Sequence, residues 1–318
     1  MKMLWCLPII FLGSALTSHA QLTLRPDVAI PKLNDFHPLP APDSEFTSQI
    51  AALVKKAGLD EKTPASQNPD KEDEWSSICV VDISDINHPR VGGWEQENFV
   101  YPASSYKLYV LGETIRRVVE GTISLDDVIT VKERNVRSGS RLSAGQKVTV
   151  SEVLRLMMTY SDNTAANEAI DLVDRQRASA LLRAMGLKGS DITRKYLTRT
   201  LEDDGYTTVP GTTSSALHFA TFLWAVENGA IGGGRGRGLI KGYMAMNQTA
   251  PNRIRGGLPD SATLYTKTGS WNTFTSEVAI VEDRGERYIV CILTALPTDK
   301  AEPRITVFVR DLHAMLQR

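Results

Sequence analysis

The chain has 318 residues, of which 42% are hydrophobic and 23% are charged, and its formal net charge at pH 7 is −1. This length allows one α/β body together with an all-helical lobe, and the near-neutral charge gives no electrostatic case for nucleic acid as a partner. The five histidines are scattered and no Cys/His group has metal-ligand spacing, so we expect no metal or other cofactor.

The first twenty residues have the pattern of a secretory signal peptide. Lys2 precedes an apolar run from Leu4 to Leu16, and Ser18-His19-Ala20 is a small-x-small cleavage pattern. Pro8 and Gly13 interrupt the run, which is short for a membrane span. Residues 1–20 are therefore predicted to be removed near Ala20, which makes the protein secreted or periplasmic, with no stable membrane anchor.

Residues 21–45 contain five of the fifteen prolines and little periodic pattern. They predict a Pro-rich leader that is extended or disordered, followed by one catalytic domain over 46–318. An amphipathic pattern predicts the first helix over 46–59, and the polar stretch 62–74 predicts a loop. Two strands are expected at 78–83 and 91–94, joined through Asn87-His88-Pro89.

The middle of the chain has helical spacing of apolar residues. Helices are predicted after Ser104, before Ser161 and over four further segments: 165–173, 175–185, 214–226 and 238–246. The Gly/Arg-rich stretch 232–238 predicts a flexible connection between two of them rather than an RNA-binding segment.

The end of the chain returns to strands, at 263–267, 276–281 and 288–295, with a hairpin signal at 283–285. A closing helix carries Ile305, Phe308 and Leu312 on one face. Strands at both ends and helices between them predict an α/β (α+β) fold. It would contain one antiparallel sheet built from both chain ends, with flanking helices and an all-helical lobe.

Two cysteines remain after the predicted signal peptide. Cys79 and Cys291 each lie in a strand-like apolar run. They can form one disulfide in an oxidising compartment or stay as buried thiols, and the sequence does not decide between these.

Ser104-Ser105-Tyr106-Lys107 is an S-x-x-K string, and Ser104 is the only serine followed by a lysine three residues later. Ser104 starts a predicted helix, whose dipole favours negative charge, and Lys107 lies one turn away on the same face. If burial lowers its pKa, Lys107 can accept the serine proton. The alternative is a capping serine beside an exposed lysine.

Two further strings follow. Ser161-Asp162-Asn163 separates two helical patterns, where a hydroxyl can relay a proton and an amide can hold a substrate amide; the alternative is a helix cap. Lys267-Thr268-Gly269-Ser270 closes a predicted strand, where the lysine attracts a carboxylate and the glycine admits close backbone approach. The alternative there is an edge-strand lysine before a turn.

In this order the three strings resemble those of the class A β-lactamase family of penicillin-recognising serine enzymes. The resemblance extends from about Phe46 to the C-terminus and includes Ser161 to Asn167 and Arg255 to Pro259. It implies a β-lactamase/transpeptidase-like fold and a set of site residues. These are Ser104 as acylated nucleophile, Lys107 as its activating partner, Ser161 as proton relay, Asn163 as substrate ligand, Lys267 with Thr268 as carboxylate anchors, the backbone N–H groups of Ser104 and Ser270 (just after Gly269) as oxyanion hole, and Arg253 as a substrate-orienting arginine.

One segment departs from the family pattern. Class A β-lactamases carry a glutamate, followed three and four residues later by leucine and asparagine, that activates the deacylating water. The corresponding segment 193–210 lacks this pattern. Glu202 is the candidate base, although an acidic cluster beside a glycine is typical of a solvated turn.

The leading hypothesis is a monomeric serine hydrolase that opens a small-molecule β-lactam through a Ser104 acyl-enzyme, with slow deacylation. One alternative is a D,D-peptidase acting on a peptidoglycan-like amide, or another serine amidase. A second is a penicillin-binding or sensor domain that acylates once and stops.

Overall fold

The computed structural model describes residues 22–62 and 76–317. The predicted signal peptide and nearly all of the 62–74 loop lie outside these residues. One five-stranded sheet has the order β2-β1-β7-β6-β5, and all its neighbouring strands are antiparallel. Its strands are β1 (Ser77–Asp82), β2 (Arg90–Trp94), β5 (Thr263–Trp271), β6 (Phe274–Asp283) and β7 (Glu286–Thr294). The prediction of one sheet built from both ends of the chain is confirmed.

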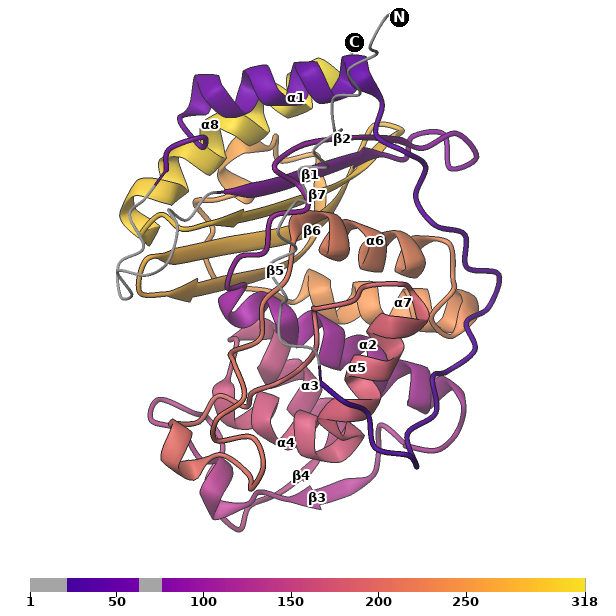
Figure 1. Cartoon of the computed structure of the whole chain (residues 1–318), viewed down its shortest axis with the longest axis vertical. Helices are drawn as coiled ribbons and strands as arrows, with labels where there is room; N and C mark the ends of the chain where they lie inside the picture. The colour runs from indigo at the N-terminus through magenta and orange to yellow at the C-terminus, as the bar shows by residue number, and fades with distance from the viewer. Residues whose placement is uncertain (1–21, 63–75, 318) are drawn as a thin grey trace, which may run out of the picture.

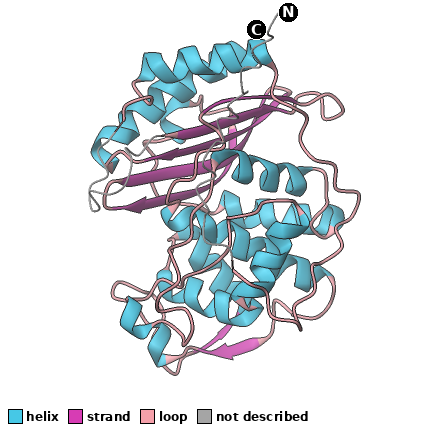
Figure 2. Ribbon diagram, viewed as in Figure 1, coloured by secondary structure: helices cyan, strands magenta, loops and turns pink. Residues whose placement is uncertain are grey.

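Helices cover both faces of the sheet, as Figures 1 and 2 show. α1 (Ser44–Ala57) and α8 (Thr298–Leu316) lie on one face, and α6 (Ala216–Glu227) lies on the other. Alternation along β1 follows from this: Ile78 and Val80 belong to the core under α1 and α8, whereas Cys79 and Val81 belong to the larger core shared with the helical lobe. Burial on both faces explains why β1 and β7 are nearly continuous apolar runs.

The helical lobe packs below the sheet in Figure 1. It contains α2 (Lys107–Val119), α3 (Val150–Thr159), α4 (Asn163–Val173), α5 (Arg175–Ala184) and α7 (Gly233–Ala245), with the short antiparallel pair β3 (Val128–Thr130) and β4 (Lys147–Thr149) at its far end. Single 3₁₀ turns lie at η1 (Ala103–Tyr106), η2 (Glu133–Asn135), η3 (Arg199–Leu201) and η4 (Arg255–Gly257). The sequence did not predict β3 and β4, because strands of three residues carry too little alternation to be recognised.

Of the two states expected for the leader, extended or disordered, the part that the structure describes has the extended one. Residues 22–43 are extended but pack along the helical lobe, where Leu33, Phe36 and Leu39 contact the core. The Trp224 indole donates a hydrogen bond to the His37 carbonyl at 2.8 Å. The prolines prevent regular structure, but apolar contacts and hydrogen bonds attach the segment to the domain.

The stretch 232–238 is also not a flexible connection, because α7 already begins at Gly233. A Cβ at Gly236 would lie 1.9 Å from the Ile231 carbonyl oxygen, so the glycine permits a close approach that any side chain would prevent.

Cys79 and Cys291 lie directly opposite each other on β1 and β7, as buried free thiols. Burial raises the pKa of both. No described helix is long and apolar enough to cross a bilayer.

Candidate active site

The turn that carries Ser104 is fixed against the sheet. Ser104 lies in η1, which continues directly into α2, and the preceding Ala103 has φ +46°, a region that non-glycine residues rarely adopt. The Ser276 hydroxyl donates to the Pro102 carbonyl at 2.7 Å. A Cβ at Gly269 would lie 2.8 Å from the Ser104 nitrogen. Gly269 therefore allows β5 to lie directly against the serine turn.

Lys107 is fully buried at the start of α2, which excludes the exposed-lysine alternative. Its Nζ lies 3.2 Å from Ser104 Oγ, 2.6 Å from the Ser161 carbonyl oxygen and 2.7 Å from Asn163 Oδ1. Burial, and then the positive charge of Lys267, hold the pKa of Lys107 well below its usual value. A neutral amine has two N–H donors and one lone pair. The two oxygen acceptors can take both donors, which leaves the lone pair for the Ser104 hydroxyl.

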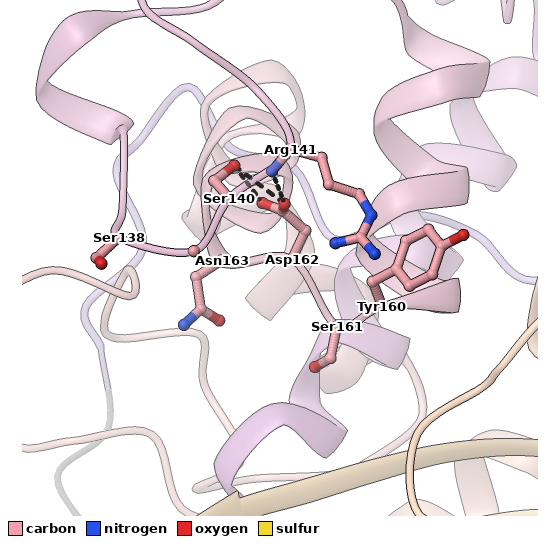
Figure 3. A pocket seen from close by; sticks show the side chains of 8 residues that line it. Ser138, Ser140, Arg141, Tyr160, Ser161, Asp162 and Asn163 are labelled. Carbon is pink, nitrogen blue, oxygen red and sulfur yellow. Dashed lines mark hydrogen bonds between the residues drawn. The ribbon is translucent and has the colours of Figure 1, made fainter.

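The Ser161-Asp162-Asn163 turn connects α3 and α4. Asp162 caps α4 by accepting from the Ala165 N–H at 3.0 Å, and it also accepts from the Arg141 N–H at 2.8 Å. Ser161 has φ +56°, and Figure 3 shows Asp162 facing Ser140 and Arg141 while Ser161 and Asn163 point away from it. The helix cap and the site residues thus coexist: the aspartate holds the turn, and its two neighbours reach Lys107.

A small pocket of about 130 Å³ adjoins this turn and is lined by residues 138–141 and 160–163. On its wall the Arg141 guanidinium lies 3.7 Å from the centre of the Tyr160 ring. The pocket lies beside Ser161 and does not include Ser104 in its lining.

Lys267 approaches from the sheet side. Its Nζ lies 3.0 Å from Ser161 Oγ, which is itself 3.1 Å from Lys107 Nζ, so one hydroxyl lies between two lysines. Burial and the charge of Arg253 lower the pKa of Lys267 to about 7. The Thr268 hydroxyl contacts that of Thr249. The strand predicted over 263–267 is longer than expected: β5 continues to Trp271, since it pairs with β6 up to the Trp271–Phe274 position.

Arg253 is buried beneath the end of β5. Its guanidinium donates to Ser270 Oγ at 2.6 Å and to the carbonyl oxygens of Gly269 and Ser276 at 3.1 Å each. Arg255 instead donates to the Pro259 and Ala262 carbonyls. Arg253 is therefore the arginine that adjoins Ser270, and much of its donor capacity already holds the strand in place.

Glu202 is buried, so the solvated-turn interpretation is wrong. Its carboxylate accepts from Arg175 at 2.9 Å, from Arg194 at 3.0 Å and from the Lys195 backbone N–H at 3.0 Å. Burial alone would raise the pKa of Glu202, but the two guanidinium groups outweigh it and the pKa is lowered. These contacts make Glu202 an anchor of the segment after α5, and its two oxygens are engaged there.

Tyr196 occupies the place beside Ser104 and Lys107, and sequence reasoning missed it. Its ring centre lies 4.2 Å from Lys107 Nζ, and the ring stacks on Tyr106 at 4.9 Å. The Tyr196 N–H donates to Asn167 Oδ1 at 2.7 Å. A tyrosine in a polar loop carries no local signal for such a position. The only hint was Asn167, which belongs to the string from Ser161 that resembles the family.

Comparison with known proteins identifies the family. The sequence profile described as the β-lactamase enzyme family matches residues 69–314. The chain belongs to this family. It is 31% identical over 214 residues to β-lactamase AST-1 of Nocardia asteroides, an alignment covering 63% of this chain and 66% of that protein. The other curated β-lactamases that it matches are covered over 51–62% of their length.

Two solved structures share the fold. PBP-A superposes with a TM-score of 0.71 at 20% identity, covering 88% of this chain and 99% of PBP-A. An ancestral class A β-lactamase of Gram-negative bacteria gives 0.69 at 21%, with 85% and 99% coverage. The profile match and the curated relatives confirm the predicted family, class A β-lactamase-like serine hydrolases. The two superpositions confirm the predicted fold. Among the described residues, no group of three or more His, Cys, Asp or Glu side chains is arranged to hold a metal ion.

Proposed function

We propose that this protein opens β-lactam amides through an acyl-enzyme on Ser104 and releases the acyl group slowly. The observation that carries the proposal is Lys107, a buried amine of lowered pKa whose Nζ lies 3.2 Å from Ser104 Oγ. A lysine in this state is a general base for a serine nucleophile.

Acylation would proceed in two steps. Ser104 Oγ attacks the lactam carbonyl carbon while its proton passes to Lys107 Nζ, and the backbone N–H groups of Ser104 and Ser270 bind the oxyanion. The C–N bond then breaks. The leaving nitrogen takes a proton from the Ser161 hydroxyl, which recovers one from Lys107 across 3.1 Å. Asn163, which also contacts Lys107, would hold the substrate amide.

A substrate carboxylate would bind at the end of β5. Lys267 and Thr268 supply a cation and a hydroxyl on that strand, and Arg253 adds positive charge next to Ser270. Charge-assisted hydrogen bonds of this kind are the strong ones in a binding site.

Slow release is supported by the contacts of the carboxylate that would have to activate the deacylating water. Glu202, the candidate from the sequence, is held by Arg175 and Arg194. The same observation favours a second candidate function, a penicillin-binding or sensor domain that stays acylated. A D,D-peptidase would use the same acylating residues on a peptidoglycan-like amide. Any of these would act outside the cytoplasm as a monomer, after signal-peptide cleavage.

A chromogenic cephalosporin and a labelled penicillin test the proposal together. We expect a penicillin adduct on the peptide containing Ser104 and slow cephalosporin turnover, both lost in Ser104→Ala. Lys107→Ala should slow acylation at least about a hundredfold, whereas Lys147→Ala, which removes an exposed lysine on β4, should not. An adduct that persists in Ser104→Ala would refute the assignment of the nucleophile.

A further inference from the structure

We propose that Tyr196 sets the lifetime of the acyl-enzyme, because its ring fills the space beside Ser104 and Lys107 in which a hydrolytic water and its base would have to lie. This inference rests on the proposed acylation of Ser104. Tyr196 would be the residue by which the site favours a persistent adduct over turnover.

Tyr196 is held at three points. Its backbone N–H donates to the buried Asn167 side chain at 2.7 Å, and its ring lies parallel to that of Tyr106, with 6° between the planes. Its hydroxyl donates to the Ala103 carbonyl, adjacent to the nucleophile, at 3.4 Å. Tyr106 is itself tied to the same segment, since its hydroxyl donates to the Arg194 carbonyl. The ring is therefore fixed under the serine turn.

The contacts of the ring are unsuited to activating water. Lys107 Nζ lies 4.2 Å from the centre of the ring, over its π-surface, and that surface offers no lone pair to a water molecule. A buried water needs about three hydrogen-bond partners, which an aromatic face does not supply. Burial, and then the neighbouring Tyr106, raise the pKa of the phenol well above its usual value, so Tyr196 stays neutral and cannot serve as the base.

Deacylation requires a water molecule and a base beside Ser104, and the Tyr196 ring leaves room for neither. A water oxygen must bond to the ester carbonyl carbon while its proton passes to a base. The bond from that carbon to Ser104 Oγ then breaks, and the proton returns to Ser104. A carboxylate in place of the Tyr196 ring would provide both room for the water and the proton acceptor.

The test measures acyl-enzyme lifetime in the full chain. Each variant is acylated with penicillin G, freed of excess reagent and followed by intact mass spectrometry, with peptide mapping to Ser104. We expect Tyr196→Glu to shorten the lifetime at least about a hundredfold, and Tyr196→Phe to keep it within about twofold, because the ring remains. Tyr196→Gln separates space from base catalysis and should lie between them. Thr198→Glu, which adds the same charge at an exposed position of the same segment, should match wild type.

A second variant keeps the inference testable if Tyr196→Glu does not fold. Tyr196→Ala opens the same space, and added formate should accelerate its deacylation in proportion to concentration while leaving wild type unaffected. If Tyr196→Glu acylates on Ser104 but keeps the wild-type lifetime, or if formate has no effect on Tyr196→Ala, the role of Tyr196 is wrong although acylation stands. If wild type forms no adduct on Ser104, the proposed function itself fails.

Discussion

Replacing Glu202 by glutamine distinguishes an anchor from a catalytic base. Breaking a buried ion pair costs about 3–5 kcal/mol when the remaining charge has no other partner. Here Arg175 keeps a contact of 2.6 Å with Asp203, and glutamine retains one acceptor oxygen. We therefore expect Glu202→Gln to lower the free energy of unfolding by about 2–3 kcal/mol, which is a fall of about 4–12 °C in melting temperature for a chain of this size.

The acyl-enzyme lifetime of Glu202→Gln should stay within about twofold of wild type, since Glu202 is expected not to activate water. Thermal melts followed by circular dichroism measure the first quantity, and mass spectrometry of the penicillin adduct measures the second. Asp204→Asn is the matched control, because Asp204 is exposed on the same loop and its change should leave both unaltered. A lifetime lengthened a hundredfold or more without loss of stability would show that Glu202 is the base.

The pH dependence of this stabilisation has a definite sign. The pKa of Glu202 is lower in the folded protein than its usual value of 4.5. The stabilising contribution of the carboxylate is therefore present above pH 4.5 and is lost as the pH falls through the folded pKa. The difference in stability between wild type and Glu202→Gln should accordingly shrink in acid, and a difference that grows there would contradict the ion-pair role.

Three further predictions concern the site. The second-order rate constant for acylation by carboxylate-bearing substrates should rise with pH as Lys107 loses its proton and fall above about pH 7 as Lys267 does; stopped-flow rates that stay flat from about pH 5 to 9 would contradict this. Gly269→Ala should slow acylation at least about tenfold, because the added Cβ would lie 2.8 Å from the Ser104 nitrogen, and a wild-type rate would show that this approach is not needed. Lys267→Ala should lower kcat/KM about 10- to 100-fold more for carboxylate-bearing substrates than for uncharged esters. Arg253→Ala should lower kcat/KM for both kinds of substrate and also the melting temperature, since four acceptors lose their donor. Equal losses for both substrates in Lys267→Ala would instead indicate a packing role for that lysine.

Features determined by local sequence could be predicted. The apolar stripe after Ser104 predicts α2, and strands at both ends of the chain predict the sheet, because periodicity reflects the face that each element buries. The strings that contain Lys107, Ser161 and Lys267 pointed to residues that the fold then brings within hydrogen-bond distance of one another.

Features determined by distant contacts could not be predicted. Glu202 looks like part of a solvated turn until Arg175, 27 residues earlier, is placed against it. The leader looks disordered until Trp224, 187 residues after His37, is seen to hold it. Tyr196 has no local pattern at all, and its importance follows only from the place of its ring against Lys107.

The kinetics of the first turnover test most directly whether Ser104 is acylated rapidly and the acyl-enzyme is then hydrolysed slowly. When the enzyme is mixed in a stopped-flow instrument with an excess of chromogenic cephalosporin, we expect a burst that approaches one equivalent of opened lactam per enzyme, followed by a slow steady state. The burst should vanish in Ser104→Ala. Rapid, sustained turnover of the wild-type protein without any burst would contradict slow deacylation and would require an efficient hydrolytic base near Ser104.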